Sequence, residues 1–410
     1  MNWLVAASFK IFGAHNEWTA RLPSALAILA VAIAFVTVAR ASLGPRGSTT
    51  AALIWMTNIG MIEKGRLIEI EALYVSLYGL AIIFWLSFWV QKKSPWLIWL
   101  PASVFLGFGL LAKGPTHLVF FYAIVLAIVW DSKDWRLLVH PAHFAALAIM
   151  LGIPAAWGIP FLYSTTSQVA MDKWSGQLTG RLRGIDFKFL SWIQNIPRAL
   201  IYFLPWLLLF PFMRFSKFAD EAQQRLARAL AWGIAVSFVA VNLVPGAVPR
   251  YSMPVIVPAS WLLAMAYVGD ALEWPRSWTR SDRDWARIVA VFVGLGIAIG
   301  AIGYPLTAFA LRNRQQVKKA AAEINALVPS NETLYAVDPD YQPVFFYVKV
   351  PLKYVSQVKK LPVDARYFLV RTKNEAEAST TPQWAPLRAH PLTRVRDYSR
   401  RELVLFKVGP

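Results

Sequence analysis

The sequence predicts an α-helical polytopic membrane protein of about ten transmembrane helices, followed by a small soluble α/β domain. The chain has 410 residues, 57% of them hydrophobic, and a mean hydropathy of +0.45, whereas soluble domains are about half apolar. The apolar residues form blocks of about 17–25 residues, the length that crosses a bilayer. Tryptophans such as Trp18, Trp96 and Trp130 stand at block ends, where aromatic rings favour the headgroup zone.

Ten apolar blocks define the predicted spans. They are Leu22–Leu43, Thr49–Ile62, Ile70–Val90, Trp96–Ala112, His117–Trp130, His143–Tyr163, Arg198–Met213, Ala227–Leu243, Met253–Leu272 and Ala286–Leu311. The apolar segment Met1–Gly13 is too short to span and is typical of an interfacial helix. We therefore expect an interfacial helix and loop over residues 1–21 and a transmembrane domain over 22–311.

The composition changes after Leu311, which predicts a soluble domain over residues 312–410. Gln315–Val328 has an amphipathic helical pattern, and short β-rich runs follow it. These runs are Thr333–Val337, Leu352–Ser356, Arg366–Thr372 and Glu402–Val408. A helix followed by short strands favours a small α/β domain.

Loop charge predicts the orientation in the membrane. One set of alternate loops is rich in Lys and Arg, for example Lys92, Lys93, Arg276 and Arg280, and cytoplasmic loops carry this excess. We therefore expect the other set of loops, together with the C-terminal domain, on the outer side of the cytoplasmic membrane.

Composition also excludes several classes of function. The chain has no cysteine, which excludes disulfides and thiolate catalysis, and its five histidines show no metal-site spacing. It contains no phosphate-binding loop, nucleophile elbow, zinc-protease motif or dinucleotide fingerprint. The net charge of +19 is explained by basic loops that meet anionic membrane lipids, so lipids and not nucleic acid are the expected partners.

Charged residues at the mouths of spans are the candidate site residues, because charge near the bilayer is costly. Glu69 and Glu71 open a predicted helix and Arg66 precedes them. Such carboxylates can bind a sugar hydroxyl or act as acid or base. The alternative is a solvated helix start, where acidic side chains favour the helix dipole.

Two further groups fall on the same predicted side. Lys113 lies in a Lys-Gly-Pro turn between two spans, and its ammonium either meets a phosphate or extends to the headgroups. Arg250 and Tyr251 lie in a proline-rich turn, where they either hold a phosphate or carboxylate or anchor the chain at the interface.

The predicted loop between residues 164 and 197 mixes basic and aromatic side chains. Trp174, Arg181 and Arg183 stand in it. Long loops without regular structure are often functional lids, so we expect these residues to contact an acceptor or to cover a lipid-facing site.

Six motifs in fixed order carry a resemblance to a known family. They are Asn2–Gly13, Glu17–Ala25, Gly65–Leu67 followed by an acid, Leu111–Pro115, Phe203–Trp206 and Pro249–Pro254. In their order and spacing the chain resembles the protein O-mannosyltransferase and lipid A aminoarabinose transferase superfamily. Its members are polytopic glycosyltransferases of the GT-C fold, similar to glycosyltransferase family 39.

This resemblance implies a bacterial inner-membrane enzyme with a polyprenyl-phosphate sugar as donor. The enzyme would move a hexosyl or pentosyl group to lipid A, a glycan or a protein at the outer face. Glu71 would match a position where relatives usually carry Asp, and it would act as the catalytic acid or base together with Glu69. The donor phosphate would be met by Lys113, Arg250, Tyr251 and Arg66. Preorganised cations stabilise the charge that a leaving phosphate gains. No cofactor is required, although Glu69 and Glu71 leave a divalent metal open.

Relatives also carry a first transmembrane helix and an outer loop with an acidic residue, which precede the helix matching Met1–Gly13. The sequence starts at that helix, so we expect either a start codon misassigned to an internal Met or a truncated, inactive chain. Two other functions remain open, a lipid-linked sugar transporter or flippase and an inactive membrane scaffold. Transporters often carry inverted repeats, and the sequence shows none.

Overall fold

The structure is a computed structural model that describes residues 1–163, 175, 179, 187, 189–218, 220–273, 282–315, 317–338, 343–372, 375, 390–396 and 402–408. The chain divides into two compact units, Met1–Ala301 and Ile302–Pro410. The expected lid residues Trp174, Arg181 and Arg183 lie outside the described residues.

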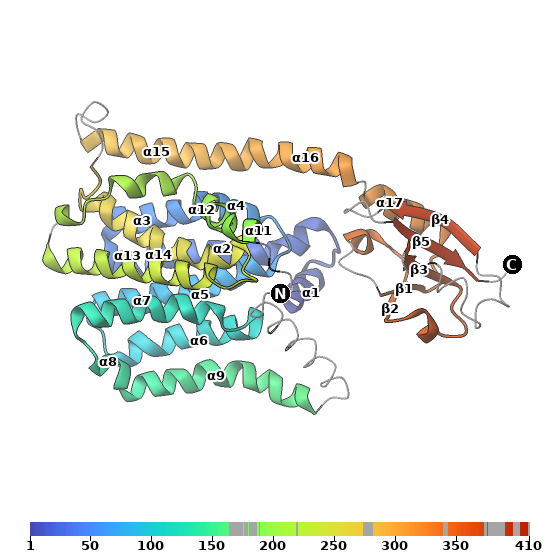
Figure 1. Cartoon of the computed structure of the whole chain (residues 1–410), viewed down its shortest axis with the longest axis horizontal. Coiled ribbons are helices and arrows are strands. Elements are labelled where there is room, and N and C mark those ends of the chain that lie inside the picture. The colour runs from blue at the N-terminus through green and yellow to red at the C-terminus, as the bar shows by residue number, and fades with distance from the viewer. Residues whose placement is uncertain are drawn as a thin grey trace. The chain divides into compact units, whose positions relative to one another are not determined.

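The first unit is a bundle of helices (Figure 1). In chain order they are α1 (Asn2–Phe12), α2 (Glu17–Thr37), α3 (Arg40–Thr57), α4 (Ile59–Gly65), α5 (Ile70–Val90), α6 (Pro95–Lys113), α7 (Thr116–Ser132), α8 (Arg136–Val139), α9 (Pro141–Leu162), α11 (Phe189–Ile193), α12 (Asn195–Ile201), η1 (Trp206–Phe212), η2 (Phe215–Lys217), α13 (Glu221–Asn242), η3 (Pro249–Val255), α14 (Ile256–Val268), α15 (Asp282–Ala298) and the π-helix η4 (Ile299–Gly303).

Each of the ten predicted spans coincides with a helix or a pair of helices. Within the described part of the chain, seven helices are long and apolar enough to cross a membrane. The remaining three spans depart from a simple rod. The segment Phe189–Ile201 with Trp206–Phe212 is bent by 90°, and α7 is a shorter apolar helix. The predicted span Thr49–Ile62 is divided between α3 and α4 at Asn58, whose backbone is extended.

Large aromatic side chains fill the interior of the bundle. Trp55, Trp85, Trp99, Trp206 and Trp261 are almost fully buried. A buried indole N–H needs an acceptor. Trp55 donates to the carbonyl oxygen of Ile28 at 2.9 Å, and Trp206 donates to the hydroxyl of Thr57 at 2.9 Å. These contacts fix α3 against its neighbours from the inside.

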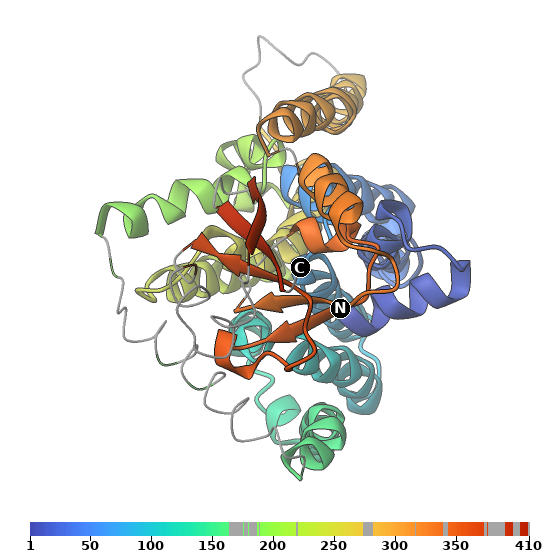
Figure 2. The ribbon, with the colours of Figure 1, turned by 90° about the vertical axis from the view of Figure 1, so that its right-hand side faces the viewer.

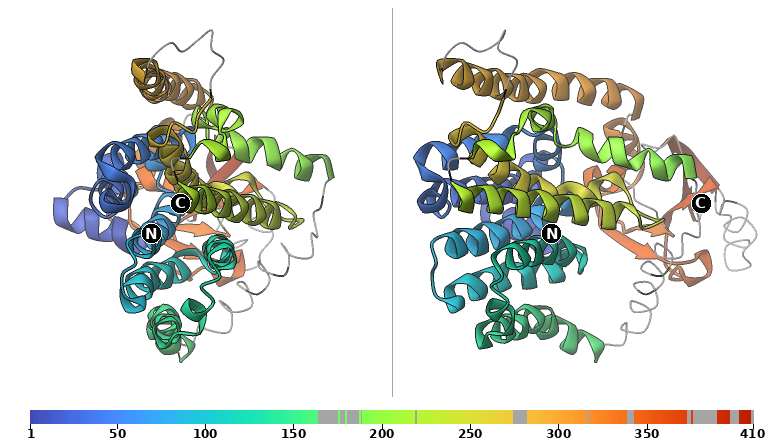
Figure 3. Two further views of the ribbon diagram at one scale, coloured as in Figure 1. Left: turned by 90° about the vertical axis from the view of Figure 1, so that its left-hand side faces the viewer. Right: turned by 60° about the vertical axis from the view of Figure 1, so that its left-hand side comes forward.

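The helices at the margins of the bundle bury less of their apolar surface. The short helix α1 lies against α2, where the hydroxyl of Ser8 donates to the carbonyl oxygen of Thr19 at 2.6 Å. Helix α9 packs on α6 at one margin, and α15 runs along another (Figure 3). Only 11% of the apolar window is buried in α9 and in the span Ala286–Ala310.

The second unit contains α16 (Tyr304–Gln315), α17 (Val317–Leu327), the short 3-10 helices η5 (Pro343–Tyr347) and η6 (Val358–Lys360), and a five-stranded sheet (Figure 2). The strands are β1 (Leu334–Val337), β2 (Leu352–Val355), β3 (Tyr367–Arg371), β4 (His390–Arg396) and β5 (Glu402–Lys407), in the order β2-β1-β3-β5-β4. Strand β1 pairs in parallel with β2 and β3, whereas β5 pairs antiparallel with β3 and β4. The predicted α/β character of this segment is confirmed, and β4 is the strand that the pattern missed.

Candidate functional site

Three charged side chains from distant parts of the chain meet at one end of the bundle. One oxygen of Glu71, Oε1, lies 3.0 Å from Nζ of Lys113 and 2.8 Å from Nε of Arg250. The Glu71 side chain is only 6% exposed, whereas those of Lys113 and Arg250 are 23% and 43% exposed. We call this group the basic cluster, because one carboxylate between two cations leaves a net charge of +1.

Local sequence explains how each member of the basic cluster reaches this point. Glu71 lies in the first turn of α5 and Lys113 in the last turn of α6, the helix ends where an acid and a base are favoured. Gly114 follows Lys113 with φ at 109°, a conformation that favours glycine and turns the chain sharply into α7. Arg250 follows Pro249 at the start of η3.

Aromatic rings and a buried histidine hold the lysine of the basic cluster. Nζ of Lys113 lies 5.2 Å from the ring centre of Tyr74 and 4.8 Å from that of Tyr251, within range of cation–π attraction. The buried ring of His117 places Nδ1 3.0 Å from the carbonyl oxygen of Gly114 and Nε2 3.0 Å from that of Leu106. The turn that presents Lys113 is therefore fixed to α6 by the histidine ring.

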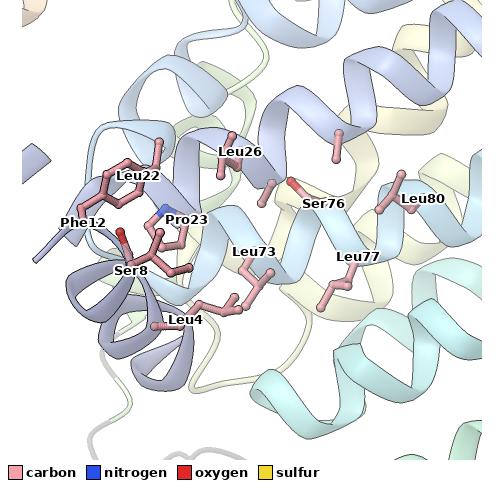
Figure 4. A pocket seen from close by; sticks show the side chains of 14 residues that line it. Leu4, Ser8, Phe12, Leu22, Pro23, Leu26, Leu73, Ser76, Leu77 and Leu80 are labelled. Atoms are coloured by element: carbon pink, nitrogen blue, oxygen red, sulfur yellow. The ribbon is translucent and has the colours of Figure 1, made fainter. Parts of the chain in front are cut away.

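An apolar groove begins beside the basic cluster. One hollow of about 490 Å³ is lined by α1, α5, α6 and α9, including Ile70 and Ala112, the chain neighbours of Glu71 and Lys113. A second hollow of about 430 Å³ is lined by α1, α2 and α5 (Figure 4). Because both hollows share Leu4, Leu73 and Leu77, we treat them as one groove, the α1–α5 groove. Its size and lining suit a hydrocarbon chain.

A second charged cluster has the opposite composition. The ammonium of Lys64 lies 2.8 Å from Glu63 Oε1 and 2.9 Å from Glu69 Oε2, and 5.8 Å from the ring centre of Tyr202. The lysine side chain is 5% exposed, whereas the two carboxylates are about one-third exposed. We call this group the acidic cluster, because one cation between two carboxylates leaves a net charge of −1.

The structure brings together some of the predicted site residues and separates others. Glu71, Lys113, Arg250 and Tyr251 converge in the basic cluster, while Glu69 pairs with Lys64 in the acidic cluster. Arg66 lines a separate hollow beside α15.

Two residues of these clusters, Lys64 and Tyr74, are not among the site residues predicted from the sequence. Tyr74 stands three residues after Glu71, so it shares the face of α5 that meets Lys113, and that spacing is the signal that could have found it. Lys64 lies beside Glu63 in sequence, yet only the folded loop brings it to Glu69.

No group of three or more His, Asp or Glu side chains converges among the residues that the structure describes. From the sequence, Glu69 and Glu71 were candidate ligands of a divalent metal. In the structure they belong to different clusters, and each contacts a cation. The structure therefore gives no support for a metal held by these two carboxylates.

The bundle closely matches solved transferase structures. The crystal structure of ArnT from Cupriavidus metallidurans in the apo state superimposes with a TM-score of 0.72 at 17% identity, and it covers 98% of this chain and 86% of that chain. The structure of the same protein bound to undecaprenyl phosphate gives a TM-score of 0.71 with the same coverage. Residues 1–159 match the family model of the dolichyl-phosphate-mannose-protein mannosyltransferases. The chain therefore has the fold of these two structures, and its first 159 residues are similar to that family.

Curated proteins similar to this chain share one name. The undecaprenyl phosphate-alpha-4-amino-4-deoxy-L-arabinose arabinosyl transferase 2 of Pseudomonas fluorescens is 24% identical over 273 residues, 65% of this chain. The enzyme of the same name from Proteus mirabilis is 22% identical over 308 residues, 73% of this chain. The chain spans about half the length of these relatives, 46% and 54% respectively.

Proposed function

We propose that this protein transfers a sugar from a polyprenyl-phosphate carrier to an acceptor at the membrane surface. The observation that supports the proposal best is the basic cluster, which gathers two cations next to Ile70 and Ala112, two residues that line an apolar groove. A lipid phosphate has the matching chemistry, an anion joined to a hydrocarbon chain. The names of the similar proteins, arabinosyl transferases that use an undecaprenyl-phosphate sugar, support the same class of donor.

The cations would act on the leaving group. In the reaction the bond from the anomeric carbon to the phosphate oxygen breaks, and its electron pair stays on the phosphate. The acceptor oxygen or nitrogen forms the new bond to that carbon and gives up a proton to a base. The phosphate gains negative charge as the bond breaks, so Lys113 and Arg250, fixed in advance, would stabilise the transition state more than the ground state.

Glu71 would position these cations. Its Oε1 contacts both of them, and its side chain is almost fully buried. A carboxylate engaged in this way orients Lys113 and Arg250 and offsets part of their repulsion. It also lowers the net charge of the cluster to +1, which allows the cluster to release as well as bind a phosphate.

The α1–α5 groove would hold the first part of the carrier's hydrocarbon chain. Its lining is almost wholly apolar, and it opens next to Glu71 and Lys113 through Ile70 and Ala112. Tyr251 would complete the site as an aromatic wall beside Lys113. We place this end of the bundle and the second unit outside the cytoplasmic membrane of a bacterium, with a lipid, glycan or protein as acceptor.

Binding of undecaprenyl phosphate to the purified protein tests the proposal. The lipid would be added to wild-type protein in detergent, and bound lipid measured by native mass spectrometry. We expect the double substitution Lys113→Ala with Arg250→Ala to weaken binding at least about 100-fold, since charge-assisted contacts to phosphate are lost. Lys93→Ala, which removes one exposed cation after α5, is the matched control.

Transfer is then measured with polyprenyl-phosphate sugars in reconstituted vesicles. Equal binding by the wild type and the double variant would remove the site assignment. Movement of the lipid-linked sugar across the vesicle membrane without formation of a glycosylated acceptor would favour a transporter instead.

A further inference from the structure

A second lipid-sized hollow lies on the opposite face of α2 from the α1–α5 groove. It has a volume of about 470 Å³ and is lined by α2, α3, α4, α15 and η4. Ala25 and Ile28 of α2 face this hollow, whereas Leu22, Leu26 and Ala30 face the groove. With 100° between successive residues of a helix, these two sets lie on nearly opposite sides of α2. The body of α2 therefore separates the hollow from the groove.

Arg66 is the one charged side chain among the described residues that line this hollow. The rest of the lining is apolar apart from Thr57. The guanidinium lies close to the surface of Gly300, because a Cβ built on that glycine would stand 3.5 Å from Nη2 of Arg66. The hollow thus combines apolar walls with one cationic group, the pattern that matches an anionic lipid.

The helix that closes the hollow packs on the core through Phe292 and Val293, and two glycines beyond them bring its backbone close to α3 and α4. A Cβ on Gly296 would stand 2.7 Å from Cβ of Thr57, and one on Gly300 would stand 3.3 Å from Ile62. Glycines spaced by four residues allow such close approach in membranes. Gly300 itself lies in the π-turn η4, and π-turns are frequent at functional sites. Neighbouring Leu295 and Ile297 are half exposed, so α15 buries little apolar surface of its own.

We propose that this hollow binds an anionic phospholipid of the bilayer. One acyl chain lies between α15 and the α2–α4 face, and the headgroup phosphate pairs with Arg66. The bound lipid supplies the apolar contacts that α15 lacks. This assignment separates Arg66 from the donor phosphate and does not depend on the proposed transferase activity.

The experiment compares four forms of the full chain, each incorporated into nanodiscs of equal phosphatidylglycerol and phosphatidylethanolamine and then extracted into mild detergent. Retained phospholipid is quantified by mass spectrometry. Gly300→Leu fills the hollow, and Gly294→Leu places the same side chain on α15 where a Cβ meets nothing within 4 Å. Arg66→Gln removes the charge and leaves the cavity open.

We expect wild-type protein and Gly294→Leu to retain phosphatidylglycerol in preference. Gly300→Leu should lose about 90% of it, the fraction that a tenfold weaker affinity removes once detergent has diluted the free lipid well below its dissociation constant. Arg66→Gln should lower the ratio of phosphatidylglycerol to phosphatidylethanolamine toward the input value. Equal retention by Gly300→Leu and Gly294→Leu overturns the site, and an unchanged ratio in Arg66→Gln overturns the role of the charge. If Gly300→Leu does not fold, Ala25→Leu fills the hollow from α2 and decides the question.

Discussion

The basic and acidic clusters contain the same kinds of side chain in opposite arrangements. In the basic cluster a buried carboxylate lies between two partly exposed cations, whereas in the acidic cluster a buried ammonium lies between two partly exposed carboxylates. The exposed groups decide what each cluster offers to a ligand. The basic cluster presents positive charge beside an apolar groove, and the acidic cluster presents negative charge. The difference shows that the buried member positions the cluster and the exposed members determine its chemistry.

The largest effect should follow from Glu71→Ala. Loss of the central carboxylate leaves Lys113 and Arg250 facing each other without a shared partner. Because both cations are partly exposed, the cost lies between that of an exposed and that of a buried ion pair, about 2–3 kcal/mol with their mutual repulsion included. Chemical unfolding in detergent measures this loss. Added undecaprenyl phosphate should restore more stability to Glu71→Ala than to the wild type, because a phosphate replaces the missing negative charge. Equal stabilisation of the wild type and Glu71→Ala would show that the phosphate does not bind at the basic cluster.

Gly109→Ala should give the next largest effect and tests how the basic cluster is held. A Cβ on Gly109 would stand 2.7 Å from Nε2 of His117, so the ring must move and the turn that presents Lys113 must follow. Overpacking of this kind costs about 2 kcal/mol. We expect undecaprenyl-phosphate affinity to fall along with stability. Gly152→Ala in α9, where a Cβ meets nothing within 4 Å, is the control and should change neither.

Lys64→Met should have a smaller effect, about 1 kcal/mol of unfolding free energy. The methionine keeps the apolar packing, and water partly solvates the two carboxylates that remain, so the loss is that of a partly exposed ion pair. Undecaprenyl-phosphate binding should stay at the wild-type level. A fall in undecaprenyl-phosphate affinity as large as that caused by Lys113→Ala would show that the two clusters form one binding site.

The smallest effect concerns alkaline pH. Burial alone would lower the pKa of Lys64, but hydrogen bonds and attraction from Glu63 and Glu69 raise it above the usual 10.5. A pKa that is higher in the folded state contributes stability below pH 10.5, and this contribution is lost as pH rises through the folded value. The difference in free energy of unfolding between the wild type and Lys64→Met should therefore shrink as the pH rises above 10.5. Parallel unfolding curves across that range would contradict the assignment.

The sequence predicted the helices better than it predicted the contacts between charges. Spans such as Ile70–Val90 follow from hydropathy, because bilayer thickness sets their length. The convergence of Lys113 and Arg250 could be anticipated only as a shared membrane face, since no sequence rule joins residues so far apart. Arg66 and Glu69 stand close to Glu71 in sequence and yet face other partners, because the loop before α5 turns their side chains in different directions.

The single oxygen shared by Lys113 and Arg250 also constrains how the chain assembles. Its three contributors come from α5, α6 and η3, so the cluster is complete only after the polypeptide has been synthesised past residue 250. Until then Glu71 and Lys113 form an incomplete pair at the mouth of two inserted helices. The basic cluster, the proposed binding site for the donor phosphate, is therefore completed late in synthesis, and a partly inserted chain does not yet contain it.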